Sequence, residues 1–80
     1  MALVRFYAAA RDAAGVGEAT VAAVRSTELV TALIARHGEP MARVLSTASL
    51  LVDGRQVSTT ADVALRPDDV VDVLPPFAGG

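Results

Sequence analysis

The chain has 80 residues, of which 52% are hydrophobic and 20% charged, a balance typical of one small globular domain rather than of a disordered chain. Its net charge of −2 argues against nucleic acid as the main partner, because binding to phosphates needs a basic face. The absence of cysteine excludes a disulfide framework, a thiol nucleophile and a thiolate metal site.

Two strands are the first expected elements. Residues 3–8 are apolar at every second position, and this period of two predicts a strand. Residues 9–17 are mostly small, and their two glycines favour a loop. Residues 18–24 are expected to form a second strand that pairs back on the first.

One main helix is expected next. Ser26 is suited to be its N-cap, and Glu28 lies in the first turn, where the helix dipole favours a negative charge. Gly38 supplies a C-terminal stop, and residues 40–45 can add a short helical turn. The apolar stripe between these ends consists of Leu29, Val30, Leu33, Ile34 and His37.

The strongest local pattern predicts a hairpin. Asp53-Gly54 stands between the runs 50–52 and 55–57, and an Asp-Gly pair in this setting favours a tight two-residue turn. Residues 59–69 are expected to form a connector. Residues 70–74 are expected to form the last strand.

The order strand, strand, helix, strand, strand, strand predicts an α+β fold of the ubiquitin-like β-grasp type. In this fold one helix packs on one face of a mixed sheet of about five strands. We expect the first and last strands to pair in parallel at the centre. The predicted domain covers residues 1–80, with residues 75–80 as an extended C-terminal tail.

The tail carries the most informative residues. Pro75 ends the last strand, because proline cannot donate to a ladder, and Pro75-Pro76 together favour a stiff, extended segment. Gly79 and Gly80 close the sequence. A terminal glycine presents a carboxylate with no side chain beside it, so it can enter a narrow slot in a partner. A plain flexible terminus is the other interpretation of this dipeptide.

Three segments resemble the small subunit of molybdopterin synthase, in the MoaD branch of the MoaD/ThiS sulfur carriers. Residues 6–15 (FYAAARDAAG) match the family's F-[FY]-A-x-x-R-[ED]-x-x-G start, and the helix ends in the sequence ARHG at residues 35–38. Residues 68–80 contain the family's D-x-V-x-x-x-P-P-x-x-G-G ending. One departure is Asp53-Gly54, where relatives often have an Asn-containing turn.

This resemblance implies a protein-borne sulfur donor. A ubiquitin-activating-type enzyme (MoeB-like) would use ATP to adenylate the Gly80 carboxylate. A persulfide sulfur, supplied by a sulfurtransferase or cysteine desulfurase, would then replace AMP and leave a thiocarboxylate. Gly79 would keep the tail slender inside the large synthase subunit (MoaE-like), where cyclic pyranopterin monophosphate receives the sulfur. No cofactor would be bound by the chain itself.

The residues themselves supply no complete active site. The chain has one histidine and no cysteine, Ser-His-acid arrangement or Walker-type loop, so any catalysis would come from its partners. It would be the sulfur-donor subunit of a sulfurtransferase complex. No apolar run reaches the roughly 18–20 residues of a membrane span, and a signal peptide is not evident. We therefore expect a soluble cytoplasmic protein.

A partner surface is expected near the tail. Tyr7 and Leu74 are predicted to face outward from neighbouring strands and to form an apolar partner patch, although Tyr7 could also simply cover the sheet. Arg11 could contact a partner or pair locally with Asp12. The residues expected to contact partners are Tyr7, Arg11, Leu74, Pro75, Pro76, Phe77 and Ala78.

Some alternatives stay open at this point. His37, in the last helical turn, favours a cation or capping donor over a catalytic group. Asp68, Asp69 and Asp72 favour a solvated turn over a metal site, since they lack calcium-loop spacing. The rival functions are sulfur transfer in thiazole or cysteine synthesis, protein modification through Gly80, and a plain interaction module.

Overall fold

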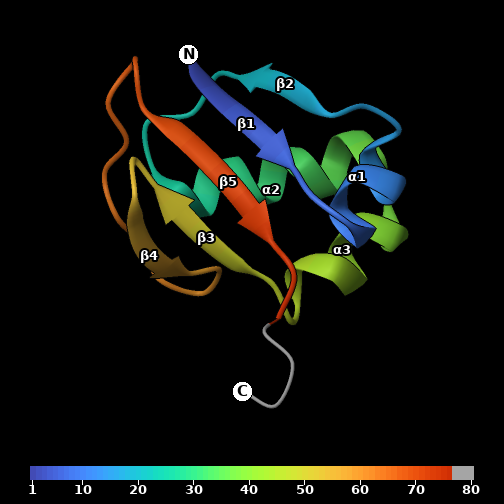
Figure 1. Cartoon of the computed structure of the whole chain (residues 1–80). Coiled ribbons are helices and arrows are strands. Elements are labelled where there is room, and N and C mark those ends of the chain that lie inside the picture. Colours follow the sequence, from blue (N-terminus) through green and yellow to red (C-terminus); the bar gives the residue numbers. More distant parts are fainter. Residues whose placement is uncertain (77–80) are drawn as a thin grey trace.

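A five-stranded mixed sheet with helices on one face forms the protein, and its computed structural model describes residues 1–76 (Figure 1). The strand order is β2-β1-β5-β3-β4, in which β1 and β5 are parallel and every other pair is antiparallel. This arrangement confirms the expected α+β layout, with the first and last strands paired inside the sheet. The strands are β1 Ala2–Phe6, β2 Glu18–Val21, β3 Ser49–Val52, β4 Arg55–Ser58 and β5 Val70–Leu74.

The core lies between the sheet and helix α2 (Ser26–His37). Leu29 and Leu33 of the helix are fully buried, as are Val71 and Val73 of β5. Each such side chain contributes about 1.5–3 kcal/mol on leaving water. Because alternate residues of a strand point to opposite faces, this burial turns the intervening residues of β5 toward the other side of the sheet.

The prediction of a loop over residues 9–17 is wrong, because helix α1 (Ala9–Ala14) forms most of this segment. Alanine is the best helix former, and Gly15 ends the helix in the left-handed region with φ 75°. The N–H of Gly15 donates to the Arg11 carbonyl at 2.9 Å. Ala10 is buried in the main core, which ties this short helix to the rest of the fold.

The second strand is shorter than the predicted 18–24, and Ser26 is not the N-cap. β2 ends at Val21 because its partner there, Ala2, is the first residue of β1. Ser26 is instead the first residue of α2. Its hydroxyl donates to the Ala61 carbonyl at 3.0 Å and accepts the Val63 N–H at 2.9 Å, so it binds the connector rather than the helix end.

The later elements agree with the sequence. Gly38 ends α2 with φ 77° and donates its N–H to the Ile34 carbonyl, and α3 (Glu39–Leu45) follows it. In the β3-β4 hairpin, Asp53 and Gly54 have φ 50° and 85°, which is the type I′ pattern. None of the helices within residues 1–76 has the length and apolar character needed to cross a membrane.

Candidate sheet face and tail exit

The sheet face opposite the helices is uncovered (Figure 1). The register places Arg5 of β1 beside Asp72 of β5, and Asp72 beside Leu51 of β3. In their strands, all three residues alternate with residues whose side chains are buried in the core. Their own side chains therefore lie on the open face. The face therefore has charged residues on its two central strands and an apolar residue next to them.

A fixed ion pair lies at the middle of this face. Arg5 Nε donates to Asp72 Oδ1 at 2.6 Å and Arg5 Nη2 to Oδ2 at 3.0 Å, a two-pronged contact. The Asp72 side chain is only 15% exposed. The hydrogen bond to Asp72 raises the pKa of Arg5, so the guanidinium keeps its charge. The Tyr7 hydroxyl lies 3.5 Å from Asp72 Oδ1, at the outer limit of a hydrogen bond.

The open face continues to the point where the last strand ends. Phe6 pairs with Val73, so Tyr7, one residue further along, lies beside Leu74. Tyr7 is 40% exposed and Leu74 half-buried. Pro75 is half-buried and Pro76 exposed, directly after β5. The chain thus leaves the sheet next to an aromatic side chain. The partner-binding roles of these residues stay predictions.

The remaining predicted tail residues lie outside the described part of the chain. These are Phe77, Ala78, Gly79 and Gly80.

Arg11 lies on α1 and is exposed. Within residues 1–76 it forms no ion pair with Asp12, and neighbouring positions of a helix do not face each other. The local-pair interpretation is therefore wrong, while partner contact by Arg11 stays a prediction. Its guanidinium lies close to Gly17, the residue directly before β2.

His37 is half-buried and packs on Phe6 rather than capping the helix. Its ring meets that of Phe6 edge-on, with centroids 5.9 Å apart and planes at 83°. Nε2 is buried and has no hydrogen-bond partner among residues 1–76. At this end of the helix, the Ile34 carbonyl accepts the N–H of Gly38.

Two of the aspartates expected in a solvated turn make different contacts within the fold. Asp69 is buried, and its Oδ2 accepts the Arg66 N–H at 2.7 Å, while Asp72 binds Arg5. In the described part of the chain, no group of three or more acids or histidines is arranged to hold a metal ion.

The Arg5–Asp72 pair is a site feature that the sequence reasoning missed. A signal for it was available. Arg5 falls on the outward-facing set of the first strand and Asp72 on that of the last, and these strands were expected to be parallel neighbours. Opposite charges on facing positions of paired strands attract, so the pair was accessible from the pattern alone.

The fold and the open face beside the exit of the last strand define the class of small ubiquitin-like β-grasp proteins. The chain belongs to the ThiS family, whose family model matches residues 4–80. It is a MoaD/ThiS-like protein, with the fold of ubiquitin-like sulfur carriers and modifiers, and this confirms the resemblance found in its sequence. A comparison with curated proteins found no match.

Three solved structures illustrate the similarity of fold. The small archaeal modifier protein 1 (SAMP1) of Methanosarcina acetivorans has a TM-score of 0.80 at 19% identity, over 99% of this chain and 95% of its own. A Pyrococcus furiosus protein, provisionally described as molybdopterin converting factor subunit 1, has a TM-score of 0.70 at 26% identity, over 95% and 97%. The Haloferax volcanii protein HVO 2177 has a TM-score of 0.71 at 22% identity, over 99% and 85%.

Proposed function

We propose that this protein is the sulfur-carrier subunit of a molybdopterin synthase, with the Gly80 carboxylate as the group that carries sulfur. The observation that supports this most directly is the path of the chain, which runs from the centre of the open sheet face along β5 into Pro75-Pro76. Membership of the ThiS family supports sulfur transfer. The 26% identity to the Pyrococcus furiosus protein supports the molybdopterin branch.

The proposed chemistry starts from an ionised carboxylate. A terminal carboxyl has a pKa of about 3.3–3.7, so at neutral pH the Gly80 carboxylate can attack the α-phosphate of ATP and release pyrophosphate. The outer sulfur of a persulfide then attacks the acyl carbon, and AMP leaves. A thiol cleaves the resulting S–S bond, which leaves the thiocarboxylate. ATP is a substrate of the adenylating partner, and the carrier itself needs no resident cofactor.

In this proposal, two partners bind the tail end of the molecule one after the other. An adenylating enzyme of the ubiquitin-activating type (MoeB-like) and a large synthase subunit (MoaE-like) each have to admit the tail. The open face offers them Tyr7 and Leu74 beside the tail, with Phe77 as a further apolar anchor. The Arg5–Asp72 pair next to them gives a partner a fixed dipole to match. Shape and charge complementarity of this kind select partners and set orientation.

The test begins with intact mass spectrometry of the protein purified from its own cells. Replacement of one terminal oxygen by sulfur is expected. Gly80→Ala is expected to reduce this product sharply while leaving the fold unchanged. The thiocarboxylated protein, mixed with a candidate large subunit and cyclic pyranopterin monophosphate, should then yield molybdopterin. A Gly80→Ala chain that gains sulfur as fast as the wild type would contradict the proposed role of Gly80.

Protein modification is the second candidate, because the fold matches that of SAMP1 closely. Analysis of the protein from its own cells distinguishes the two functions. A modifier would give covalent conjugates that disappear when Gly79-Gly80 is deleted, whereas a dedicated carrier would give the thiocarboxylate without conjugates. A thiocarboxylate that feeds thiazole or cysteine synthesis, and not molybdopterin, would place the protein in another sulfur pathway.

A further inference from the structure

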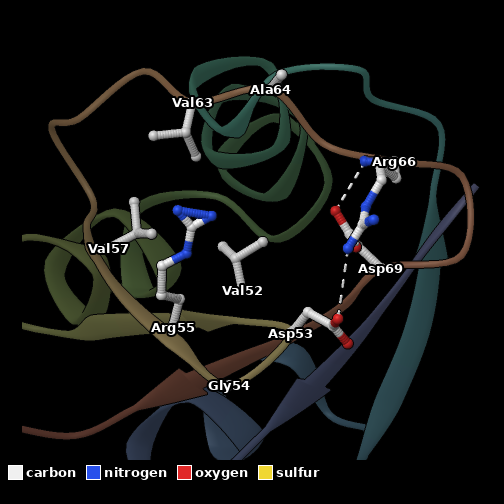
Figure 2. Close-up of a pocket in the computed structure, with 9 residues that line it drawn as sticks. All are labelled: Val52, Asp53, Gly54, Arg55, Val57, Val63, Ala64, Arg66 and Asp69. Atoms are coloured by element: carbon white, nitrogen blue, oxygen red, sulfur yellow. Dashed lines mark hydrogen bonds and ion pairs between the residues drawn. The ribbon is translucent and has the colours of Figure 1, made fainter.

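A second surface lies at the end of the sheet away from the tail. The β3-β4 hairpin and the connector before β5 enclose a hollow of about 620 Å³ (Figure 2). Its walls include Val52 and Val57 from the hairpin and Val63 from the connector, all half-buried. This volume falls within the range of pockets that take ligands or partner side chains, and nothing in the proposed sulfur chemistry uses it.

One side of the hollow is lined by two ion pairs and held by hydrogen bonds of the backbone. Arg66 Nη2 lies 3.6 Å from Asp53 Oδ2, and Arg66 Nε lies 3.5 Å from Asp69 Oδ1. The buried Asp69 also accepts the backbone N–H of Arg66. The Asp53 N–H donates to the Val70 carbonyl at 2.8 Å, which fixes the hairpin turn to the start of β5. A preformed wall of this kind needs little ordering when a ligand binds.

Arg55, which also lines the hollow, differs from Arg66 in its ion pairing. Its guanidinium points inward, toward Val63, whereas the Arg66 side chain lies against Asp53 and Asp69 (Figure 2). Within residues 1–76, Arg55 has no ion pair and no side-chain hydrogen bond. The nearest acid along the chain, Asp53, has its carboxylate directed to Arg66. The hollow therefore places beside apolar walls a guanidinium that has no ion pair among the described residues, while its other three charged side chains, Asp53, Arg66 and Asp69, pair with one another.

We propose that this hollow, named here the Arg55 hollow after the residue that supplies its free charge, is a docking site for an acidic segment of a partner protein. In that segment a carboxylate lies next to an aliphatic side chain. The carboxylate binds the Arg55 guanidinium, and the aliphatic group packs on Val52, Val57 and Val63. A small anion would gain only the exposed ion pair, which contributes little by itself. The apolar walls favour a peptide, and arginine is a frequent anchor of interfaces.

The position of the hollow leaves the tail free. Asp53 binds the first residue of β5, and the chain leaves the sheet after its last residue, Leu74. Four residue steps of strand separate these points by about 13 Å. A partner segment in the Arg55 hollow can thus hold the protein while the open face and the tail engage another protein. The docking site is independent of the sulfur chemistry and can be tested without it.

The experiment is an NMR titration of the full chain labelled with ¹⁵N. One probe is a blocked peptide of alternating Leu and Glu, and its control is the same peptide with Gln in place of Glu. The Glu peptide should shift the amide signals of Val52, Val57, Val63 and Ala64, and the Gln peptide should shift them much less. Arg55→Gln should weaken binding up to about fivefold, the most that an exposed ion pair contributes.

Arg43→Gln is the matched control, since Arg43 is also an exposed arginine, lies on α3 outside the hollow, and its loss changes the net charge by the same amount. It should leave binding unchanged. Arg55→Glu should lose the Glu peptide and accept a Leu-Lys peptide in its place. Equal weakening by both neutral variants, or peptide shifts confined to other surfaces, would overturn the proposal. Acetate that reproduces the full set of shifts at the same concentration would also overturn it, because the hollow would then be a small-anion site.

Discussion

Replacing Ala8 with glycine should stabilise this protein. Ala8 has φ 52° and ψ −124°, and the Ala10 N–H donates to the Tyr7 carbonyl at 3.0 Å. These angles are those of the second residue of a type II′ turn, a position that normally takes glycine. The β-carbon of Ala8 is strained in this conformation, and such strain costs about 1–3 kcal/mol. The turn fixes the direction in which the chain enters α1, directly after Tyr7.

The net gain is smaller than the strain that is relieved. Glycine makes the unfolded chain more flexible, which costs about 0.4–1 kcal/mol. Ala8 is exposed, so little packing is lost with its methyl group. The difference is a stabilisation of about 1 kcal/mol. For a domain of this size, it corresponds to a rise in Tm of about 4–8 °C.

The assay is thermal unfolding followed by circular dichroism, with Ala9→Gly as the matched control. Ala9 is also exposed but is the first residue of α1, where glycine costs up to about 1 kcal/mol. The two glycine variants should therefore change Tm in opposite directions. If Ala8→Gly lowers Tm as much as Ala9→Gly does, the reasoning about strain at Ala8 is refuted.

Two further predictions concern ion pairs. Arg5→Gln should lower the urea midpoint more than the double change Arg5→Gln with Asp72→Asn does, because the single change leaves a shielded carboxylate without its partner; a double variant less stable than the single one would contradict this. The hydrogen bonds from Arg25 and Thr27 lower the pKa of Asp62. A lowered pKa gives stability that is present above the unfolded value of about 3.9 and is lost as the pH falls through the folded value. Asp62→Asn should therefore be less stable than the wild type at pH 7, and the gap between their urea midpoints should close as the pH falls below about 4; a constant gap would contradict the assignment.

The sheet could be predicted from the sequence because its signals are local. The alternation in the first and last strands, and the Asp53-Gly54 turn, each depend on a few neighbouring residues. The short helix α1 could not be predicted in the same way. A helix of six residues is marginal in water, and this one is held by packing, with Ala10 in the core. The alanine-rich run that precedes Gly15 gives no sign of that packing.

The two candidate surfaces also differ in how far the sequence predicts them. The positions of Tyr7 and Leu74 followed from strand period and pairing, which the sequence carries. The Arg55 hollow joins the hairpin to the connector, and its charge depends on where Asp53 is directed. Because Asp53 is only two residues from Arg55 in the sequence, an ion pair between the two would be expected from the sequence alone. Only the folded chain shows that Arg66 takes this carboxylate.

Strand β5 links the two proposals and also keeps them separable. Its first residue, Val70, receives the hydrogen bond that holds the wall of the Arg55 hollow, and its last, Leu74, leads into the tail. The strand is paired on both sides, to β1 and β3, so it does not shift easily in response to a ligand at one end. A change at Arg55 should therefore leave the tail's reactivity unaffected, and a change at Gly80 should leave peptide binding unaffected. Effects of each change on both sites would show that the two ends communicate through the sheet.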